Sequence, residues 1–279
     1  ETDLILRLYN RSMITIGKRD FEFVKSGSGT NIVFVPGSFS TSAAWRGIQE
    51  RLPNGYQFIS TSLCGYGETT ESRTLSNNSI EHEIEILYNI VEQLCQPVHL
   101  VGHSFGGLVC FAAALKKKLN IKSITTFEAN PLSLLKTAIY AKSFQTVREI
   151  NRHFEEEYFS GNKDAVKSII DYWGGNGTFS SMPKVVQDYC RASALTNILD
   201  WRTAFTFDAS SEDYQKLKIP CLIVRSELAN TAMVQISNLL STSIPNSKIA
   251  VVNKANHFLI NSHRSECANL LATFLKGDN

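Results

Sequence analysis

Residues 99–107 read HLVGHSFGG, and this stretch decides the fold. An apolar run enters the sequence GHSFGG, and a second apolar run, LVCFAAAL, follows directly at residues 108–115. A strand that ends abruptly, with a helix beginning at once, needs small residues on both sides of the bend. The glycines of a G-x-S-x-G pattern at residues 102–106 meet that need. We therefore expect a strand, a sharp turn with Ser104 at its tip, and a helix.

Short apolar runs alternate with helical periodicity along the rest of the chain. The runs expected to form strands are residues 3–8, 21–27, 31–37, 56–63, 98–102, 122–129, 220–226 and 247–253, the first two of them antiparallel. Runs this apolar and this short suit a parallel sheet covered by helices on both faces. Helical periodicity appears at residues 80–94 and 263–277. The alternation predicts an α/β fold with a mostly parallel, doubly wound sheet.

One region breaks this alternation. Far more residues separate the runs 122–129 and 220–226 than a structureless loop contains. Most of them have a helical pattern. We expect residues 1–130 and 214–279 to form the core, and residues 131–213 to form an inserted helical cap, or lid, over the carboxyl edge of the sheet.

A serine hydroxyl needs a base to take its proton before it can act as a nucleophile. Five of the six histidines fall in expected helices, strands, the cap or the sharp turn itself; these are His82, His99, His103, His153 and His263. His257 differs, because it lies in VVNKANHFLI, in the loop between the last strand and the final helix. From there a histidine can reach over the sheet edge to Ser104, which makes His257 the candidate base.

An acyl-transfer site also needs backbone N–H groups to bind the developing oxyanion. Phe105, directly after the nucleophile, is one expected donor. The other is expected in the loop after NIVFVPG, where Ser38 and Phe39 are the candidates.

These features together resemble the α/β-hydrolase family, and the resemblance covers nearly the whole chain. Residues 35–45, VPGSFSTSAAW, resemble the family's H-G-x-x-x-S-x-x-W loop, with Pro36 in place of the usual His. Residues 60–69, STSLCGYGET, resemble the D-x-x-G-x-G-x-S loop, with Ser62 in place of Asp. The stretches GHSFGG and ANHFLI match the nucleophile and histidine motifs. The resemblance implies an α/β-hydrolase fold with a helical cap.

The third member of the implied catalytic triad has two candidate positions. In most of the family an Asp follows the strand that corresponds to residues 220–226, but Ala229 occupies that position here. Glu128, in TTFEANP, ends the preceding strand, which is an alternative location for the acid in this fold. Glu227 comes directly after the usual strand. Family members with similar caps carry the acid at the earlier place, so the resemblance favours Glu128, with Glu227 as the alternative acid and a triad without an acid left open.

The resemblance implies acyl transfer to water through a Ser-His-Glu triad and an acyl-enzyme. The bond cleaved can be an ester, a thioester or an activated C–C bond. A serine nucleophile argues against haloalkane dehalogenase and epoxide hydrolase chemistry, which use Asp in this fold. Two rival classes stay open: a non-hydrolytic lyase, acyltransferase or cyclase on the same scaffold, and a ligand-binding protein with weak turnover. Neither a metal nor an organic cofactor is expected.

Aromatic side chains are concentrated in the expected cap, and Trp173, Tyr140 and Phe144 are candidates for lining the substrate pocket. Any one of them can instead pack the cap onto the core. Together they suggest a small-molecule substrate with an apolar or aromatic acyl group.

Composition limits the other partners. The net charge of +2 gives no indication of nucleic acid or a membrane surface, and no apolar run reaches the roughly 18 residues needed to span a bilayer. The six cysteines show no C-x-x-C spacing, which favours free thiols in a reducing cytoplasm. A homodimer is left open.

Overall fold

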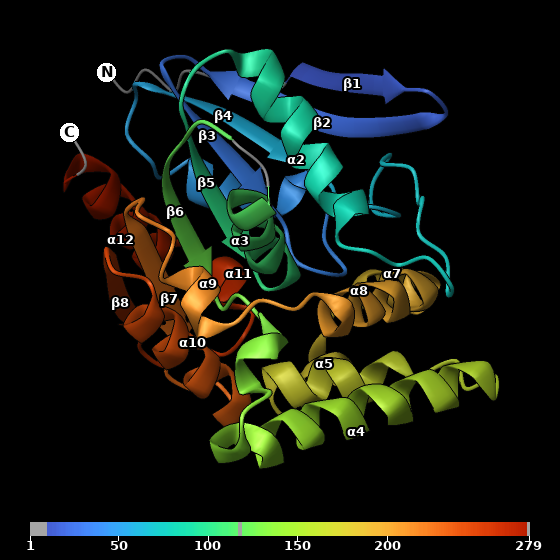
Figure 1. Cartoon of the computed structure of the whole chain (residues 1–279). Helices are drawn as coiled ribbons and strands as arrows, with labels where there is room; N and C mark the ends of the chain where they lie inside the picture. The colour runs from blue at the N-terminus through green and yellow to red at the C-terminus, as the bar shows by residue number, and fades with distance from the viewer. Residues whose placement is uncertain (1–9, 117–118, 278–279) are drawn as a thin grey trace.

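The computed structural model describes residues 10–116 and 119–277, and an eight-stranded sheet forms its centre (Figure 1). The strands are β1 (Asn10–Ile16), β2 (Arg19–Gly27), β3 (Thr30–Val35), β4 (Tyr56–Thr61), β5 (Val98–His103), β6 (Ile121–Phe127), β7 (Cys221–Ser226) and β8 (Ser247–Val252). Their order across the sheet is β1-β2-β4-β3-β5-β6-β7-β8. The β1–β2 and β2–β4 pairs are antiparallel, and the other pairs are parallel. The expected mostly parallel α/β sheet is confirmed.

The strands expected from residue 21 onward are all present. The expected strand at residues 3–8 lies outside the described residues. The strand that pairs with β2 at this edge of the sheet is β1, which escaped prediction. Ile14 is the one buried residue of β1, so this edge strand carries no clear apolar alternation.

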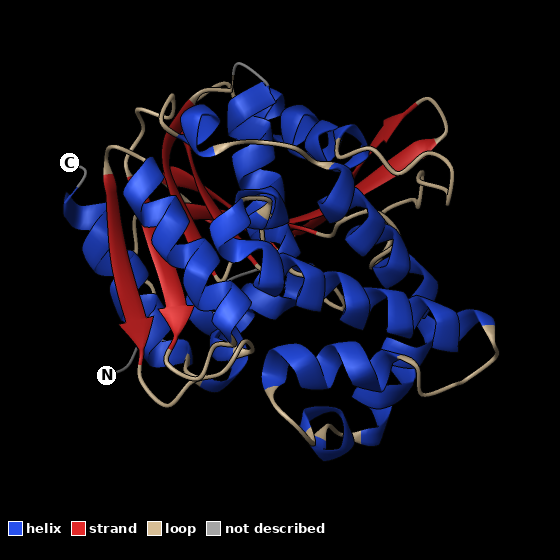
Figure 2. Cartoon of the chain, turned by 60° about the horizontal axis from the view of Figure 1, so that its bottom comes forward, coloured by secondary structure: helices blue, strands red, loops and turns tan. Residues whose placement is uncertain are grey.

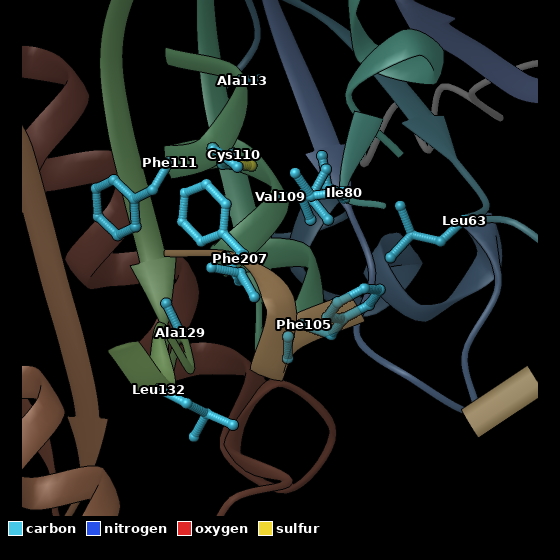
Figure 3. Close-up of a cluster of buried hydrophobic side chains, with 14 of the residues drawn as sticks. Leu63, Ile80, Phe105, Val109, Cys110, Phe111, Ala113, Ala129, Leu132 and Phe207 are labelled. Atoms are coloured by element: carbon cyan, nitrogen blue, oxygen red, sulfur yellow. The ribbon is translucent and has the colours of Figure 1, made fainter. Parts of the chain in front are cut away.

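Helices cover both faces of the sheet. Alternate residues of β3 point to opposite faces, so that Ile32 and Phe34 belong to one core cluster and Val33 to the other. The helices packed in the Val33 cluster are α2 (Glu81–Leu94), α3 (Phe105–Lys116) and α10 (Thr231–Ser243), and those in the other cluster are α1 (Arg46–Gln49) and α12 (Arg264–Gly277). Figure 3 shows part of the Val33 cluster around α3. The α3 helix is therefore held between the sheet and the neighbouring helices. This packing fixes the position of its first residue, Phe105.

A helical segment lies between β6 and β7, and we call residues 132–206 the helical insertion. Its elements are η2 (Leu132–Leu135), η3 (Ala138–Tyr140), α4 (Ala141–Phe159), α5 (Val166–Gly174), α6 (Thr178–Ser181), α7 (Lys184–Ala192) and α8 (Ala194–Thr206). In Figure 1 it lies beyond the ends toward which the β5 and β6 arrows point, and Figure 2 brings it forward. The short helix α9 (Ser211–Tyr214) follows, and its Tyr214 packs edge to face on Phe111 of α3, in the core.

Within the described ranges, no helix combines the length and the apolar character that crossing a membrane requires. All six cysteines fall in these ranges. Each is a free thiol, and Cys95 alone among them is exposed.

Candidate active site

Ser104 lies at the tip of a tight turn between β5 and α3. Its φ of 52° is a left-handed conformation that a residue with a side chain adopts only under constraint. The Ser104 N–H donates to the Phe127 carbonyl at 2.9 Å, which fixes the turn against β6. A Cβ at Gly106 would lie 2.2 Å from the Pro36 carbonyl oxygen, so only glycine lets the strand and helix approach this closely. The sequence HLVGHSFGG thus presents the serine hydroxyl beyond the sheet edge.

His257 reaches Ser104 from the loop between β8 and α11 (Leu259–Ser262). Its Nε2 lies 2.9 Å from Ser104 Oγ, and the residue is 5% exposed. The loop is anchored to the helical insertion, because Asn256 Nδ2 donates to the Gly174 carbonyl at 2.7 Å. The imidazole ring of His257 also lies near the indole of Trp173, with 5.3 Å between the ring centroids.

Glu128 follows β6 directly, and it holds the second nitrogen of His257. Its Oε2 lies 2.6 Å from His257 Nδ1, while its Oε1 accepts hydrogen bonds from the Ser226 N–H at 2.7 Å and from the Ser226 hydroxyl. Burial alone would raise the pKa of Glu128, but the hydrogen bonds from His257 and Ser226 outweigh it and lower that pKa below its ordinary value. Glu128 is therefore a carboxylate at neutral pH, and it accepts a hydrogen bond from the Nδ1–H group of His257.

The alternative acid, Glu227, does not face the histidine ring. Its side chain is exposed, and its Oε2 accepts a hydrogen bond from the Lys254 N–H at 2.7 Å. Its own N–H donates to the Val252 carbonyl at 3.0 Å, which continues the pairing of β7 with β8. The structure thus brings Ser104, His257 and Glu128 together and leaves Glu227 outside.

His103 and Ser226 support this arrangement, and sequence reasoning missed both in that role. His103 Nε2 donates to the His257 backbone carbonyl at 2.9 Å, so the histidine next to the nucleophile fixes the loop that carries the candidate base. Burial lowers the pKa of His103 to about 3, with the nearby His257 adding to the effect. The His103 ring is therefore neutral. For Ser226, the one signal in the sequence was that a polar residue ends an otherwise apolar strand, at residues 220–226.

The loop after β3 lies against the nucleophile. A Cβ at Gly37 would meet Ser104 Cβ at 3.0 Å, and the next two residues, Ser38 and Phe39, line a cavity together with Ser104. Phe39 has a φ of 57°, which turns the chain back toward the sheet. Phe105 opens α3, so its N–H has no partner within the helix. Both expected sources of oxyanion donors therefore lie beside Ser104.

The cavity over Ser104 has a volume of about 50 Å³. Its apolar walls come mainly from the helical insertion, where Ile169, Ile170 and Trp173 of α5 face Trp201 of α8. The indoles of Trp173 and Trp201 stack with 5.6 Å between centroids and 12° between planes.

Two of the three aromatic residues expected in the pocket lie elsewhere. Tyr140 closes η3 and does not line the cavity. Phe144 faces a separate groove along α4 and α8, where it packs edge to face on Phe205 at 6.0 Å. Both residues belong to η3 and α4, whereas α5 and α8 are the elements of the helical insertion that supply residues to the cavity lining. Trp173 is the one of the three that lines it.

A buried polar network joins α8 to the loop after β3. Asp200 Oδ2 accepts hydrogen bonds from the Ser38 hydroxyl at 2.6 Å and the Tyr66 hydroxyl at 2.7 Å, and Arg73 donates to Asp200 Oδ1 at 2.7 Å. Arg73 also lies 3.0 Å from Glu83 of α2. Burial raises the pKa of Glu83 to about 7 although Arg73 opposes the rise, and burial likewise raises the pKa of Asp200. The network fixes Ser38 from the helical insertion.

In the part of the chain that the structure describes, no three or more His, Cys, Asp or Glu side chains form a group that could hold a metal ion.

Comparisons with known proteins identify the fold. A model of the alpha/beta hydrolase fold matches residues 30–262. An uncharacterized hydrolase of Bacillus subtilis, YugF, is 23% identical over 268 residues, which cover 92% of this chain and 93% of that protein. A pimeloyl-(acyl-carrier protein) methyl ester esterase of Aliivibrio salmonicida is 21% identical over 267 residues, covering 91% and 95%.

Solved structures share the whole architecture. A bromoperoxidase from Bacillus anthracis superposes with a TM-score of 0.78 at 22% identity, covering 96% of this chain and 100% of that one. The family match spans most of the sequence and includes strands β3 to β8, the turn at Ser104 and the loop that carries His257. The chain belongs to the alpha/beta hydrolase fold family.

Proposed function

We propose that the protein hydrolyses carboxylic esters through an acyl-enzyme formed on Ser104. The Ser104 hydroxyl attacks the ester carbonyl, and His257 takes the hydroxyl proton and returns it to the departing alcohol. Water then attacks the acyl-enzyme, with His257 again taking a proton, and the acid is released. Glu128 keeps the imidazole oriented and stabilises its protonated form.

One observation carries this proposal: the hydrogen-bond relay from Ser104 through both ring nitrogens of His257 to Glu128. Its two distances are 2.9 Å and 2.6 Å. An ionised carboxylate only accepts hydrogen bonds, so Nδ1 must carry the proton. The Nε2 atom is then free to accept the Ser104 proton, which is the tautomer that the base needs.

The surroundings of Ser104 supply the remaining requirement, stabilisation of the oxyanion. The N–H of Phe105 and one N–H from Ser38 or Phe39 are the proposed donors. Two such donors, fixed before the substrate arrives, would bind the tetrahedral intermediate more tightly than the planar ester.

The comparisons and the cavity narrow the substrate. Curated relatives include methyl ester esterases, which supports an ester over a thioester or C–C bond. The cavity of about 50 Å³ has about a third of the volume of an engineered 150 Å³ cavity that binds benzene. This favours a short acyl group over an aromatic one. The helical insertion supplies most of the apolar wall, so we propose that it acts as the cap that selects the acyl group.

The test combines active-site labelling with turnover. Wild-type protein should react with a fluorophosphonate probe and hydrolyse short-chain methyl esters, and Ser104→Ala should abolish both. Glu128→Gln should slow both by about two to four orders of magnitude. Glu227→Gln is the matched control, because its carboxylate is exposed and bonded to Lys254, and it should leave both rates unchanged.

Three outcomes would contradict the proposal. Absence of labelling and of ester hydrolysis in the wild type would favour a ligand-binding protein. Slowing by Glu227→Gln, with Glu128→Gln near wild type, would move the acid to the later strand. Consumption of ester without release of the free acid would indicate an acyltransferase instead.

A further inference from the structure

One buried acid in the sheet plays no part in the proposed mechanism. Glu22 lies in β2 between Phe21 and Phe23, and it is 1% exposed. Successive side chains of a strand point to opposite faces, and both phenylalanines belong to the Val33 cluster. The Glu22 side chain therefore points to the other face of the sheet. Arg11 does little to offset the cost of burying it, because Arg11 Nη2 is 3.9 Å from Glu22 Oε1 and the Arg11 side chain is 57% exposed.

Hydrogen bonds hold this carboxyl group instead, and they lead to the loop after β3. Glu22 Oε1 accepts from the Ser42 hydroxyl and Oε2 accepts from the Glu68 N–H, both at 2.6 Å. Ser42 is the first residue of the short helix η1 (Ser42–Trp45). Its N–H donates to the Ser62 hydroxyl oxygen at 2.9 Å. Ser42 is thus fixed by its side chain and by its backbone.

Ser62 is the residue at which this chain departs from the D-x-x-G-x-G-x-S loop, and Glu22 brings a carboxyl group to the same place. A Cβ at Gly67 would collide with Glu22 Oε2 and would lie 2.7 Å from Ser62 Oγ. The two side chains therefore approach one point, where only glycine leaves them space. An acid is thus absent from position 62 of the sequence but present beside it in the fold, carried by β2.

A second buried carboxyl group holds the other end of the loop after β3. The Ser38 hydroxyl donates to Asp200 of α8 at 2.6 Å, and three residues separate Ser38 from Ser42. Phe39, which lies between them, has a φ of 57°. The proposed second oxyanion donor is the N–H of Ser38 or Phe39. It therefore lies in a strained bend that is fixed at both ends from outside the loop.

We propose that Glu22 is a positioning residue, which acts through Ser42 to hold the second oxyanion donor where the reaction needs it. This inference rests on the proposed esterase function. Glu22 does not line the cavity over Ser104, so its effect is on the placement of the loop. A displacement of about 1 Å in a group that stabilises the transition state can cost about two orders of magnitude in rate. Loss of the Glu22 carboxyl group should therefore lower kcat and leave KM nearly unchanged.

Glu22→Gln tests the carboxyl group at constant size. The Glu68 N–H can only donate, so the amide oxygen has to turn toward it, and the amide NH2 then faces Ser42. The Ser42 hydroxyl loses its acceptor. We expect kcat for methyl propionate to fall by about tenfold or more, with KM within about twofold of the wild-type value. The affinity for ethylboronic acid should fall by the same factor as kcat, because this probe forms a tetrahedral adduct on Ser104 and carries the same ethyl group.

Two control variants separate positioning from general destabilisation. Glu68→Gln changes an exposed side chain and keeps the N–H that bonds Glu22, so it should leave kcat, KM and boronic acid affinity unchanged. Ser123→Ala removes a buried hydrogen bond, in which Ser123 Oγ lies 2.7 Å from His99 Nδ1, near the start of β6. It should lower the melting temperature but keep the wild-type kcat and boronic acid affinity.

A double-mutant cycle asks whether Glu22 acts through Ser42. Ser42→Ala removes the donor hydroxyl, and by itself it should lower kcat about as much as Glu22→Gln does. Because both substitutions break the same hydrogen bond, the double variant should be no slower than the slower single variant. A double variant as slow as the product of the two single effects would show that the residues act independently, and it would overturn the proposal.

The outcomes separate this inference from the function beneath it. Unchanged kcat and boronic acid affinity in Glu22→Gln would overturn the positioning role and leave the esterase proposal intact. If Glu22→Gln does not fold, the same result in Ser42→Ala has the same meaning. A rise in KM with kcat unchanged would also overturn the positioning role. If the wild type hydrolyses no short-chain methyl ester and Ser104 is not labelled by a fluorophosphonate, the proposed function itself fails.

Discussion

Glu83 makes the stability of the folded chain depend on pH in a way that one substitution can isolate. The side chain is fully buried on α2, beside Arg73, and its Oε2 accepts a hydrogen bond from the Cys64 N–H at 3.1 Å. Burial raises its pKa from 4.5 to about 7. The folded protein then binds this proton more tightly than the unfolded chain does. The contribution of Glu83 to stability is therefore largest below pH 4.5 and is lost as the pH rises through 7.

The size of the effect follows from the two pKa values. A rise from 4.5 to about 7 corresponds to a loss of about 3 kcal/mol over the full range, of which about 2 to 3 kcal/mol falls between pH 5 and pH 8. Glu83→Gln removes the titrating group. Any fixed cost of placing an amide against Arg73 shifts the whole stability curve and does not change its dependence on pH.

Urea unfolding followed by tryptophan fluorescence at pH 5 and pH 8 measures this difference. Between these values the wild type should lose about 2 to 3 kcal/mol more of its unfolding free energy than Glu83→Gln does. Glu92→Gln is the control, because Glu92 lies exposed on the same helix, and it should keep the wild-type dependence. Equal pH dependence in the wild type and Glu83→Gln would refute the reasoning, since Glu83 would then be ionised in the folded protein throughout.

Three further predictions concern the site. Ser226→Ala removes the hydroxyl that bonds Glu128 but leaves the backbone N–H in place, so kcat for ester hydrolysis should fall about tenfold with KM little changed. Gly106→Ala would place a Cβ 2.2 Å from the Pro36 carbonyl oxygen, and its melting temperature should fall by about 5 °C or more in a thermal scan. Ser38→Ala removes the hydroxyl bonded to the buried carboxylate of α8, so kcat and the affinity for a boronic acid transition-state analogue should fall together by about fivefold; a fall in thermal stability alone would contradict a positioning role.

The turn at Ser104 and the loop at His257 could be predicted because each is specified by adjacent residues. The two glycines of G-x-S-x-G mark the sharp turn in the sequence itself, although the group that Gly106 must avoid, the Pro36 carbonyl, comes from the loop after β3. Asp200 had no such signal, because its partner Ser38 is 162 residues away in sequence and only the folded insertion brings the two together.

The two candidate acids show how strand register decides what local sequence leaves open. Glu128 and Glu227 each follow a strand that ends at the same sheet edge, and β6 and β7 are hydrogen-bonded neighbours with Phe127 opposite Val224. The Glu128 N–H donates to the Val224 carbonyl at 2.8 Å, and Glu128 takes a φ of 52°, which turns its side chain along the edge toward His257.

Glu227 instead continues the pairing of β7 with β8 through its N–H, and its side chain turns outward to the Lys254 backbone. Ser226, the last residue of β7, faces Glu128 instead. Its N–H and its hydroxyl both donate hydrogen bonds to the Glu128 carboxylate. The end of β7 thus supplies two donors to the carboxylate that follows β6, and these donors hold that carboxylate in place against the histidine. Under the proposed function, Glu128 and Ser226 form one unit, because the hydrogen bonds from Ser226 help to keep Glu128 ionised and so able to hold the proton on His257 Nδ1.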